Sequence, residues 1–339
     1  MNLAMRKLTK HLHFALAAFA LALLTAAAPA PARAAAVDGH FDKTLTVSGP
    51  VNLEVTTGSG NITVRTGDSG KVEIHARIHA NDSWLSAGRD AESRVQYIEQ
   101  HPPVEQSGNT ITIGHEEDHD LMRNISISYE ITTPAETRLH SATGSGNQTV
   151  EGLNGSVEST TGSGDLKLSN IGGDTTSRAG SGDVTISNVK GAVHAASGSG
   201  SIQAEGVTGA MNASTGSGDI ILTQTGAGDV EASSGSGSVK INGVKGAVRV
   251  GTGSGNIRAQ GTPTGNWRLH TGSGDLTVEL PEKTSFELYA HTSSGSIHSK
   301  FPITVQGTIS PRDLHGQVGS GGPTVELRTS SGTIHIESR

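Results

Sequence analysis

The sequence of 339 residues contains no cysteine and few aromatic residues. The absence of cysteine excludes disulfide bonds, and it leaves no residue to carry a bacterial lipid anchor. Phenylalanine, tryptophan and tyrosine together make up only 3% of the chain, which excludes a large aromatic core. Stability must therefore come from packed aliphatic side chains and from backbone hydrogen bonds.

The chain also lacks a run of basic residues, and its formal net charge is −7. Loss of the first 36 residues removes Arg6, Lys7, Lys10 and Arg33 and no acidic residue, which moves the charge to −11. An acidic protein without a basic run binds polyanions poorly. We therefore expect no nucleic-acid partner.

Residues 1–36 have the pattern of a secretory signal peptide. A basic start from Arg6 to Lys10 precedes the apolar run "FALAAFALALLTAAA", and "PAPARAAA" offers cleavage sites near Ala34 or Ala36. The apolar run is shorter than the roughly 20 residues that a membrane-spanning helix needs, and no later segment is apolar enough. We expect an exported protein, periplasmic, at the cell surface or secreted, with no stable membrane insertion after signal cleavage.

Glycine is abundant, with 46 residues, and much of it recurs at a fixed period. The triplet Gly-Ser-Gly returns with a period of about 18 residues that is constant to within one position. Such a period predicts an array of equal structural units. The triplets begin at Gly144, Gly162, Gly180, Gly198, Gly216, Gly235, Gly253 and Gly272.

Apolar residues form columns when the repeats are aligned on these triplets. Two columns stand two positions apart, which predicts a strand with one buried face. A later apolar column, a second glycine and a further run of small residues predict a second corner and a second strand. The first column is Leu166, Val184, Ile202, Ile220, Val239, Ile257 and Leu276, and the second is Leu168, Ile186, Ala204, Leu222, Ile241, Ala259 and Val278.

Stacked repeats would place like residues about 4.8 Å apart, the spacing of neighbouring strands, and join the columns into a thin continuous core. The sequence therefore predicts an all-β fold, a single-chain β-solenoid or β-helix with coils of about 18 residues. The general chirality of parallel connections favours a right-handed coil. An antiparallel sandwich also has short strands and turns, but it has no reason to keep so constant a period.

The regular repeats cover residues 141–280, and the flanking segments differ from them. We expect residues 37–140 to form strands and a short helix, at about 87–100, that cap the solenoid. Residues 281–339 are expected to form irregular terminal coils, with a looped insertion near 301–322. The expected helix has Ala91, Val95 and Ile98 on one face, and Pro102 and Pro103 follow it.

The Gly-Ser-Gly segment resembles a binding loop in composition, but its many copies argue against that role. A phosphate loop leads into a helix, a calcium roll has a repeat half as long, and a serine nucleophile needs Gly-x-Ser-x-Gly. The triplet fits none of these patterns. We interpret it as a corner in which glycine tolerates positive φ and lets stacked turns approach closely, and in which the next residue, Asp, Asn or Ser, bonds its own backbone.

A different motif, "HEEDH", matches the zinc-protease pattern His-Glu-x-x-His at His115, Glu116 and His119. The pattern binds zinc on a helix, where positions i and i+4 share a face. Here it stands between the strand-like segments "NTITIG" and "NISISYEI", so we expect an exposed hairpin loop. His115, Glu116 and His119 are therefore weak candidates for metal ligands, and we predict neither a resident metal nor another cofactor.

Catalytic residues are not indicated elsewhere in the chain. A glycan-cleaving β-helix needs clustered carboxylates and aromatic platforms for sugar rings. The carboxylates are dispersed along the repeats, and the chain has only two tryptophans, Trp84 and Trp267. Trp267 occupies an apolar column position and is expected in the core. We predict no enzyme activity.

Several segments together resemble the putative-adhesin family of bacterial exported proteins of unknown function. They are "FDKTLTVSGPVNLEVTTGSGNITV", the proline-containing "YEITTPAETRLHSATGSGN" and the ladder of "TGSGDL"-type coils. Auto-transporter-adhesin-like head domains have similar coils. The resemblance covers about Val37 to Arg339, implies a β-helical fold at or outside the cell envelope, and brings no catalytic residues.

These observations predict a non-enzymatic envelope or surface protein, an adhesin or binding scaffold. Its partners would be cell-surface or envelope glycans or proteins, bound by an extended, acidic, polar solenoid face. One alternative is an enzyme that acts on envelope polysaccharide. Another is a metal-binding protein that uses the loop from His115 to His119.

Overall fold

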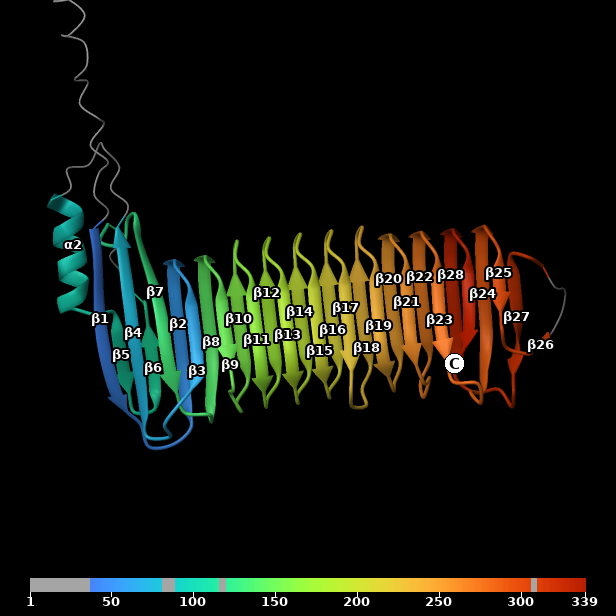
Figure 1. Ribbon diagram of the computed structural model, residues 1–339, viewed down its shortest axis with the longest axis horizontal. Coiled ribbons are helices and arrows are strands. Elements are labelled where there is room, and N and C mark those ends of the chain that lie inside the picture. Colours follow the sequence, from blue (N-terminus) through green and yellow to red (C-terminus); the bar gives the residue numbers. More distant parts are fainter. Residues whose placement is uncertain (1–36, 81–88, 116–119, 306–309) are drawn as a thin grey trace, which may run out of the picture.

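The computed structural model describes residues 37–80, 89–115, 120–305 and 310–339, in which one helix and two long β-sheets form a rod (Figure 1). The predicted all-β class is confirmed. The predicted signal segment, residues 1–36, lies outside the described residues. Within the described residues, no helix is long and apolar enough to cross a membrane.

The two sheets share one set of buried side chains between them. From β8 to β23 successive strands alternate between the sheets, and their pairing within each sheet is parallel. The order in sheet A is β1 (Val37–Thr46), β4 (Lys71–Ala80), β7 (Ile125–Thr133), β3 (Ile62–Thr66), β9 (Gln148–Glu151), β11 (Leu166–Ile171), β13 (Val184–Val189), β15 (Ile202–Val207), β17 (Ile220–Gln224), β19 (Val239–Val244), β21 (Ile257–Gly261), β23 (Leu276–Leu280), β29 (Ile334–Ser338) and β25 (Ile297–Ser299). The order in sheet B is β26 (Thr304–Val305), β27 (Asp313–Val318), β24 (Phe286–Ser294), β28 (Thr324–Ser331), β22 (Trp267–Ser273), β20 (Val248–Ser254), β18 (Val230–Ser234), β16 (Met211–Thr215), β14 (Val193–Ser197), β12 (Thr175–Ala179), β10 (Val157–Thr161), β8 (Thr137–Ser145), β2 (Val51–Ser59), β6 (Thr110–Ile113) and β5 (Val104–Ser107).

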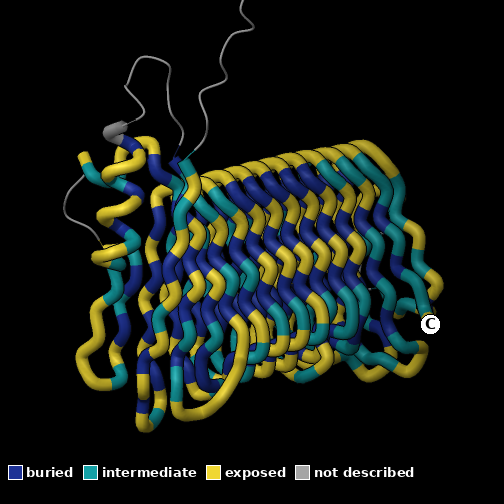
Figure 2. The backbone as a smooth tube through the Cα atoms, turned by 60° about the vertical axis from the view of Figure 1, so that its left-hand side comes forward, coloured by how far each residue is buried: buried dark blue, intermediate teal, exposed yellow. Residues whose placement is uncertain are grey.

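The predicted apolar columns are confirmed by strand pairing and burial. Leu166 pairs with Val184 and Val184 with Ile202, so each column residue in sheet A stands beside its counterpart in the next repeat. These three side chains are at most 1% exposed. Figure 2 shows the result as bands of buried and exposed residues that run along the whole stack. The residue that alternates outward in each strand is therefore free to vary in chemistry.

The triplet glycines allow close approach between repeats, and some of them also have a positive φ. A Cβ on Gly164 or Gly182 would stand less than 3.0 Å from the backbone of the preceding repeat. Neither of these glycines has a positive φ, but the same corner position has one at Gly60 and Gly274, with φ of 141° and 154°, so the expected positive φ holds at some corners only. Positive φ also occurs just before the apolar residue of the second corner, at Asn170 and Asn188 with φ of 57° and 56°, and at the matching Gly206. Asparagine and glycine are the residues that enter this region at low cost.

The helix α2 (Arg89–Gln100) covers one end of the rod (Figure 1). Its predicted apolar face is buried, with Ala91, Val95 and Ile98 at most 3% exposed. The helix lies so close to β1 that a Cβ on Gly39 would overlap Val95. Glu99 accepts a hydrogen bond from the backbone N–H of His40 at 2.9 Å. The helix therefore covers the core and occupies a donor on the edge strand, which protects a sheet edge from pairing with other chains.

The segment near 301–322, expected as a looped insertion, contains sheet. Strand β27 pairs antiparallel with β24, and the short strand β26 pairs with β27. Phe301 is buried and packs edge-on against Phe286, with ring centroids 5.4 Å apart. The segment therefore extends sheet B beyond the parallel array, so the insertion includes paired strands at 304–305 and 313–318. Alternation from Asp313 to Val318 was the signal that sequence reasoning missed.

Tyr129, on β7, carries a buried hydroxyl without a hydrogen-bond partner in the described part of the chain. We expect Tyr129→Phe to stabilise the protein by about 1 kcal/mol at pH 7, because it removes an unsatisfied polar group. Burial also raises the pKa of Tyr129 above its ordinary value near 10. As the pH rises, the unfolded chain therefore releases the hydroxyl proton of Tyr129 before the folded chain does. Above pH 10 the free energy of unfolding of the parent should fall by up to about 1.4 kcal/mol per pH unit from this group, and the Tyr129→Phe protein should not show this loss.

Denaturant unfolding of the two forms at pH 7 and pH 10.5 measures this difference. Tyr289→Phe, at a side chain that is 40% exposed, is the control and should leave stability unchanged. A Tyr129→Phe protein that is less stable at pH 7 and shows no relative gain at pH 10.5 would contradict the assignment.

Candidate binding face

The structure separates the two strands that flank the His-Glu-x-x-His motif. Strand β6 belongs to sheet B and β7 to sheet A, so the connection crosses between sheets and is not the hairpin that we expected. His115 is exposed at the start of this connection. Glu116 and His119 lie outside the described residues. Among the residues that are described, no three His, Asp or Glu side chains gather as metal ligands would.

The polar column after each Gly-Ser-Gly triplet bonds between repeats. Asp165 accepts the backbone N–H of Asp183 at 2.9 Å, and Asp183 accepts that of Ser201 at 2.7 Å. The sequence predicted the residue types at this position correctly, but it predicted the wrong bonding partner. These side chains accept the N–H of the next repeat and not one of their own backbone. These carboxylates therefore help to hold successive repeats together.

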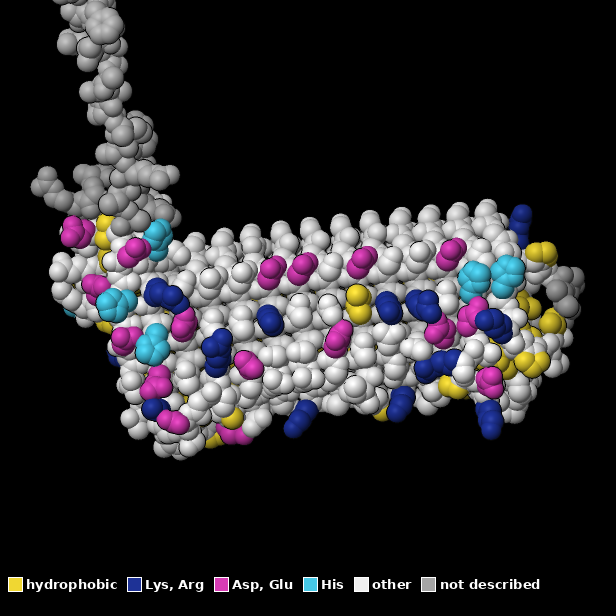
Figure 3. Space-filling view, viewed as in Figure 1, with side chains coloured by type: hydrophobic (Ala, Val, Ile, Leu, Met, Phe, Trp, Pro, Cys, Tyr) yellow, Lys and Arg dark blue, Asp and Glu magenta, His cyan; other side chains and the backbone are white. Residues whose placement is uncertain are grey.

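The exposed aspartates that follow the triplets lie at the corners and not within the strands of the sheets. Asp165, Asp183, Asp219 and Asp275 are exposed in the corner column. Figure 3 shows one long side of the protein, with acidic side chains in a line along the edge of the regular repeats and single charges scattered below it. A continuous acidic sheet face is absent from this view.

The outer face of sheet B is built of two rows of outward side chains that run across the strands. Strand pairing fixes their order, since each residue stands opposite its counterpart in the next repeat. The first row is Glu54, His140, Glu158, Thr176, His194, Asn212, Glu231, Arg249, Arg268, Glu326 and Tyr289. The second row is Thr56, Ala142, Thr160, Arg178, Ala196, Ser214, Ser233, Gly251, His270, Arg328 and His291.

Basic side chains gather in these rows on β20, β22 and β28, and we call this group the arginine face. The arginine face comprises the basic residues Arg249, Arg268, His270 and Arg328, together with Gly251, which lies among them. Arg249 and Arg268 stand directly opposite each other on neighbouring strands. Like charges in such positions repel, so the pairing has a cost for the fold.

Glu326 is the acidic partner of this group. Its carboxylate lies 3.4 Å from Nε of Arg268 and 2.7 Å from Nε of Arg328. Arg249 has no ion pair in the described ranges, and the nearby Glu231 accepts a hydrogen bond from the Asn212 side chain at 3.3 Å instead. The face therefore holds more positive charge than its own carboxylates neutralise.

Gly251 interrupts the second row in the interior of β20. A Cβ built there meets no atom within 4 Å, and its φ is not positive. Neither packing nor backbone conformation therefore requires glycine. Glycine weakens a strand interior, and where nothing internal demands it, it often marks close approach by a ligand.

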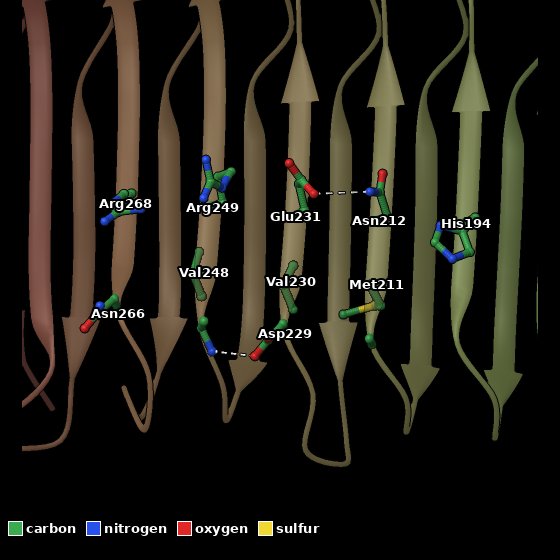
Figure 4. A pocket seen from close by; sticks show the side chains of 12 residues that line it. His194, Met211, Asn212, Asp229, Val230, Glu231, Val248, Arg249, Asn266 and Arg268 are labelled. Atoms are coloured by element: carbon green, nitrogen blue, oxygen red, sulfur yellow. Dashed lines mark hydrogen bonds between the residues drawn. The ribbon is translucent and has the colours of Figure 1, made fainter.

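The missing side chain opens a hollow in this face that adjoins two others, while a separate hollow of about 400 Å³ lies at the other end of sheet B beside Glu54, His140 and Glu158. The hollow at Gly251 has a volume of about 380 Å³ and is lined by Arg249, Arg268, His270 and Arg328 together with the carboxylates of Glu231 and Glu326. The next, of about 490 Å³, shares Arg249 and Arg268 with it. Figure 4 shows Arg268, Arg249, Glu231, Asn212 and His194 side by side along this second hollow, on neighbouring strands of sheet B.

The third hollow, of about 350 Å³, lies at the other side of Arg328. Its wall includes Tyr289, which is 40% exposed and stacks on His315 with ring centroids 4.1 Å apart. The three hollows share residues and form one trough across the strands. An exposed, supported aromatic ring and unneutralised guanidinium groups are features of a binding surface.

Sequence reasoning assigned Trp267 to the core, and this is confirmed, because Trp267 is fully buried and its Nε1 donates to the Gly246 carbonyl at 3.1 Å. Trp84 lies outside the described residues. The arginine face was missed. Its signal was present as a glycine in an outward strand position, at "VRVGTGSG", but only strand register shows that Arg249, Arg268 and Arg328 are neighbours.

Comparisons with known proteins identify a family. The family described as Toastrack DUF4097 matches residues 51–337. No curated protein matches the chain.

Three solved structures are similar to this chain. A protein from Clostridium sporogenes, described as a putative cell adhesion protein, is 11% identical over 89% of this chain and 100% of its own, with a TM-score of 0.23. A putative adhesin from Bacteroides fragilis is 18% identical over 71% and 97%, with a TM-score of 0.36. A putative adhesin from Parabacteroides distasonis is 14% identical over 88% and 97%, with a TM-score of 0.27.

Proposed function

The chain belongs to the Toastrack DUF4097 family, and from this premise we propose that it is an exported, non-enzymatic binding protein. The outer face of sheet B contacts polymers of the cell surface or envelope. The observation that carries the proposal is Gly251, a strand glycine that opens a hollow among arginines where the fold itself has no use for glycine. Binding is spread along the trough, so that several weak contacts act together.

We propose further that each repeat is one coil, of about 18 residues, in a right-handed β-solenoid. The pairing of Leu166 with Val184 and of Arg249 with Arg268 supports this coil length. Residues 37–140 act as the N-terminal cap, 141–280 as the regular array and 281–339 as the C-terminal end. Limited proteolysis tests these boundaries, an experimental structure tests the hand, and N-terminal sequencing of the exported protein tests cleavage after Ala34 or Ala36.

Co-sedimentation of the purified protein with whole cells, isolated peptidoglycan and surface polysaccharide tests the binding function. We expect saturable binding to at least one of these fractions, with the polymer unchanged in size. Retention of binding in EDTA is expected, since no metal takes part. Shortening of the polymer would favour an enzyme, and loss of binding in EDTA would favour the metal-binding alternative at His115.

Gly251→Val is the informative variant because valine fills the hollow and suits a strand. We expect it to reduce binding at least about tenfold while the protein stays as stable as the parent. Ala142→Val is the matched control, because Ala142 stands in the same outer row on β8, at the other end of the array. Equal binding by the two variants, or no binding to any fraction by the parent, would overturn the proposal.

A further inference from the structure

We propose that the trough recognises a linear polysaccharide whose sugars carry carboxylate groups. This inference rests on the proposed binding function and names its ligand class. It is argued from the arrangement of charge, from the position of the aromatic ring and from the pairing state of the strands.

The arginine face has three guanidinium groups and two neighbouring carboxylates, Glu231 and Glu326, and so keeps an excess of positive charge. Three guanidinium groups, those of Arg249, Arg268 and Arg328, share one bonded acidic partner, Glu326. Arg249 and Arg268 stand opposite each other with no carboxylate bonded between them in the described residues. A carboxylate placed there would accept hydrogen bonds from both groups, and planar guanidinium pairs well with planar carboxylate.

Gly251 gives such a carboxylate room to approach. The hollow lies beside both arginines, and the next residue in its row is His270, which stands opposite Arg328. A ligand group in the hollow can therefore reach donors on three strands, β20, β22 and β28, beside the carboxylates of Glu231 and Glu326. Its own ring atoms can rest on the backbone that glycine leaves uncovered.

Tyr289 continues the first row two strands beyond Arg268. Neighbouring strands stand about 4.8 Å apart, so the ring lies about 10 Å along the trough from Arg268. A chain of rings can stack one sugar on Tyr289 while a carboxylate further along reaches the arginines. His315, opposite Tyr289 on the neighbouring strand β27, stacks on one face of the ring and leaves the other face for a sugar.

An acidic peptide fits this surface less well. The strands under the hollow at Gly251, β20, β22 and β28, are each paired on both sides, so no backbone edge is open to an added strand there. Two exposed large apolar side chains of the rod, Tyr97 and Ile221, lie away from the trough, which leaves Tyr289 as its aromatic contact. A peptide helix or side-chain anchors would need apolar pockets here.

Calorimetric titration of the purified protein with polygalacturonate, neutral dextran and polyglutamate tests the inference. We expect saturable binding of polygalacturonate that weakens as salt rises, and no binding of dextran. Binding of polyglutamate as tight as that of polygalacturonate would overturn the assignment to sugars, since charge alone would then explain the interaction. Equal binding of dextran would overturn the assignment to carboxylates.

Two variants locate the contacts. Arg249→Gln should weaken polygalacturonate binding at least about tenfold, because it removes a charge-assisted hydrogen bond. Arg138→Gln is the matched control, since Arg138 is exposed on the same sheet at β8 and far from the trough. Tyr289→Ala should weaken binding about threefold to tenfold, and Tyr289→Phe should preserve it because the ring remains.

The two levels of the proposal fail in different ways. If the protein sediments with envelope fractions but does not bind polygalacturonate, the binding function stands and the carboxylated ligand is wrong. If it binds neither, both are wrong. If Arg249→Gln and Arg138→Gln bind polygalacturonate equally well, the protein binds the polymer somewhere other than the trough. The inference is then overturned.

Discussion

Gly182→Ala is expected to destabilise the protein by at least about 3 kcal/mol or to prevent its folding. The added Cβ would overlap the backbone carbonyl of Gly164 in the preceding repeat. This neighbour is backbone, and the N–H of Gly164 is bonded to the Thr161 hydroxyl at 3.1 Å, so it cannot rotate away as a flexible side chain could. Relief would require the repeats to move apart, and the strand spacing of the whole stack opposes that movement.

The repeats themselves support this expectation. Serine replaces the first glycine of the corner at Ser293 and Ser330, whereas the third position keeps its glycine in the same corners as Gly295 and Gly332. In the regular repeats, a Cβ at the third position of the triplet would come closer to the carbonyl of the preceding repeat than a Cβ at the first position would. The two positions therefore differ in how much side chain they tolerate.

Gly251→Ala is the matched control, because Gly251 is also a strand glycine but has open space around it. Alanine there should stabilise the protein by about 0.5–1 kcal/mol, since glycine loses more conformational freedom on folding. Denaturant unfolding of both variants measures the contrast. A Gly182→Ala protein with parental stability would show that the repeats can separate, and it would refute close approach as the reason for the glycine.

The fold was predictable because its signal is repeated. The columns that begin at Leu166 and Leu168 recur in every regular repeat, and each copy reinforces the same strand and the same register. The helix was also recognisable, because Ala91, Val95 and Ile98 share one face and prolines follow. Strand β27 was harder to find, since it occurs once and alternates in a segment rich in Gly and Pro.

The binding face could not be read from the sequence for a geometric reason. Arg249 and Arg268 stand in successive repeats, whereas Arg328 comes much later in the chain and joins them because β28 pairs with β22 across the C-terminal strands. Only the pairing places them together. The His-Glu-x-x-His motif shows the opposite case, in which a compact pattern in sequence falls on a connection between two sheets.

The hydroxyl column before the triplet was overlooked because threonine and serine there looked like ordinary corner residues. Thr215 is buried, donates to the carbonyl of Gly200 at 2.8 Å and accepts the N–H of Gly218 at 3.2 Å. Ser197 makes the same two bonds one repeat earlier. Each hydroxyl thus joins its own corner to the corner of the preceding repeat.

Thr215→Val is therefore expected to cost about 1–3 kcal/mol, although valine has nearly the same shape, because a buried N–H and a buried carbonyl lose their partner. Thr215→Ser is the control and should retain most of the stability, since serine already serves at Ser197.

The column also contains one natural gap, Ala179, which is 7% exposed. Ala179→Ser should supply the missing hydroxyl and stabilise the protein by about 0.5–1.5 kcal/mol. Unfolding curves for the three variants measure these changes in stability. If Thr215→Val is less stable but Ala179→Ser is no more stable than the parent, the hydrogen bonds between corners do not hold the repeats in register. The shape of the side chain at Thr215 would then explain the loss.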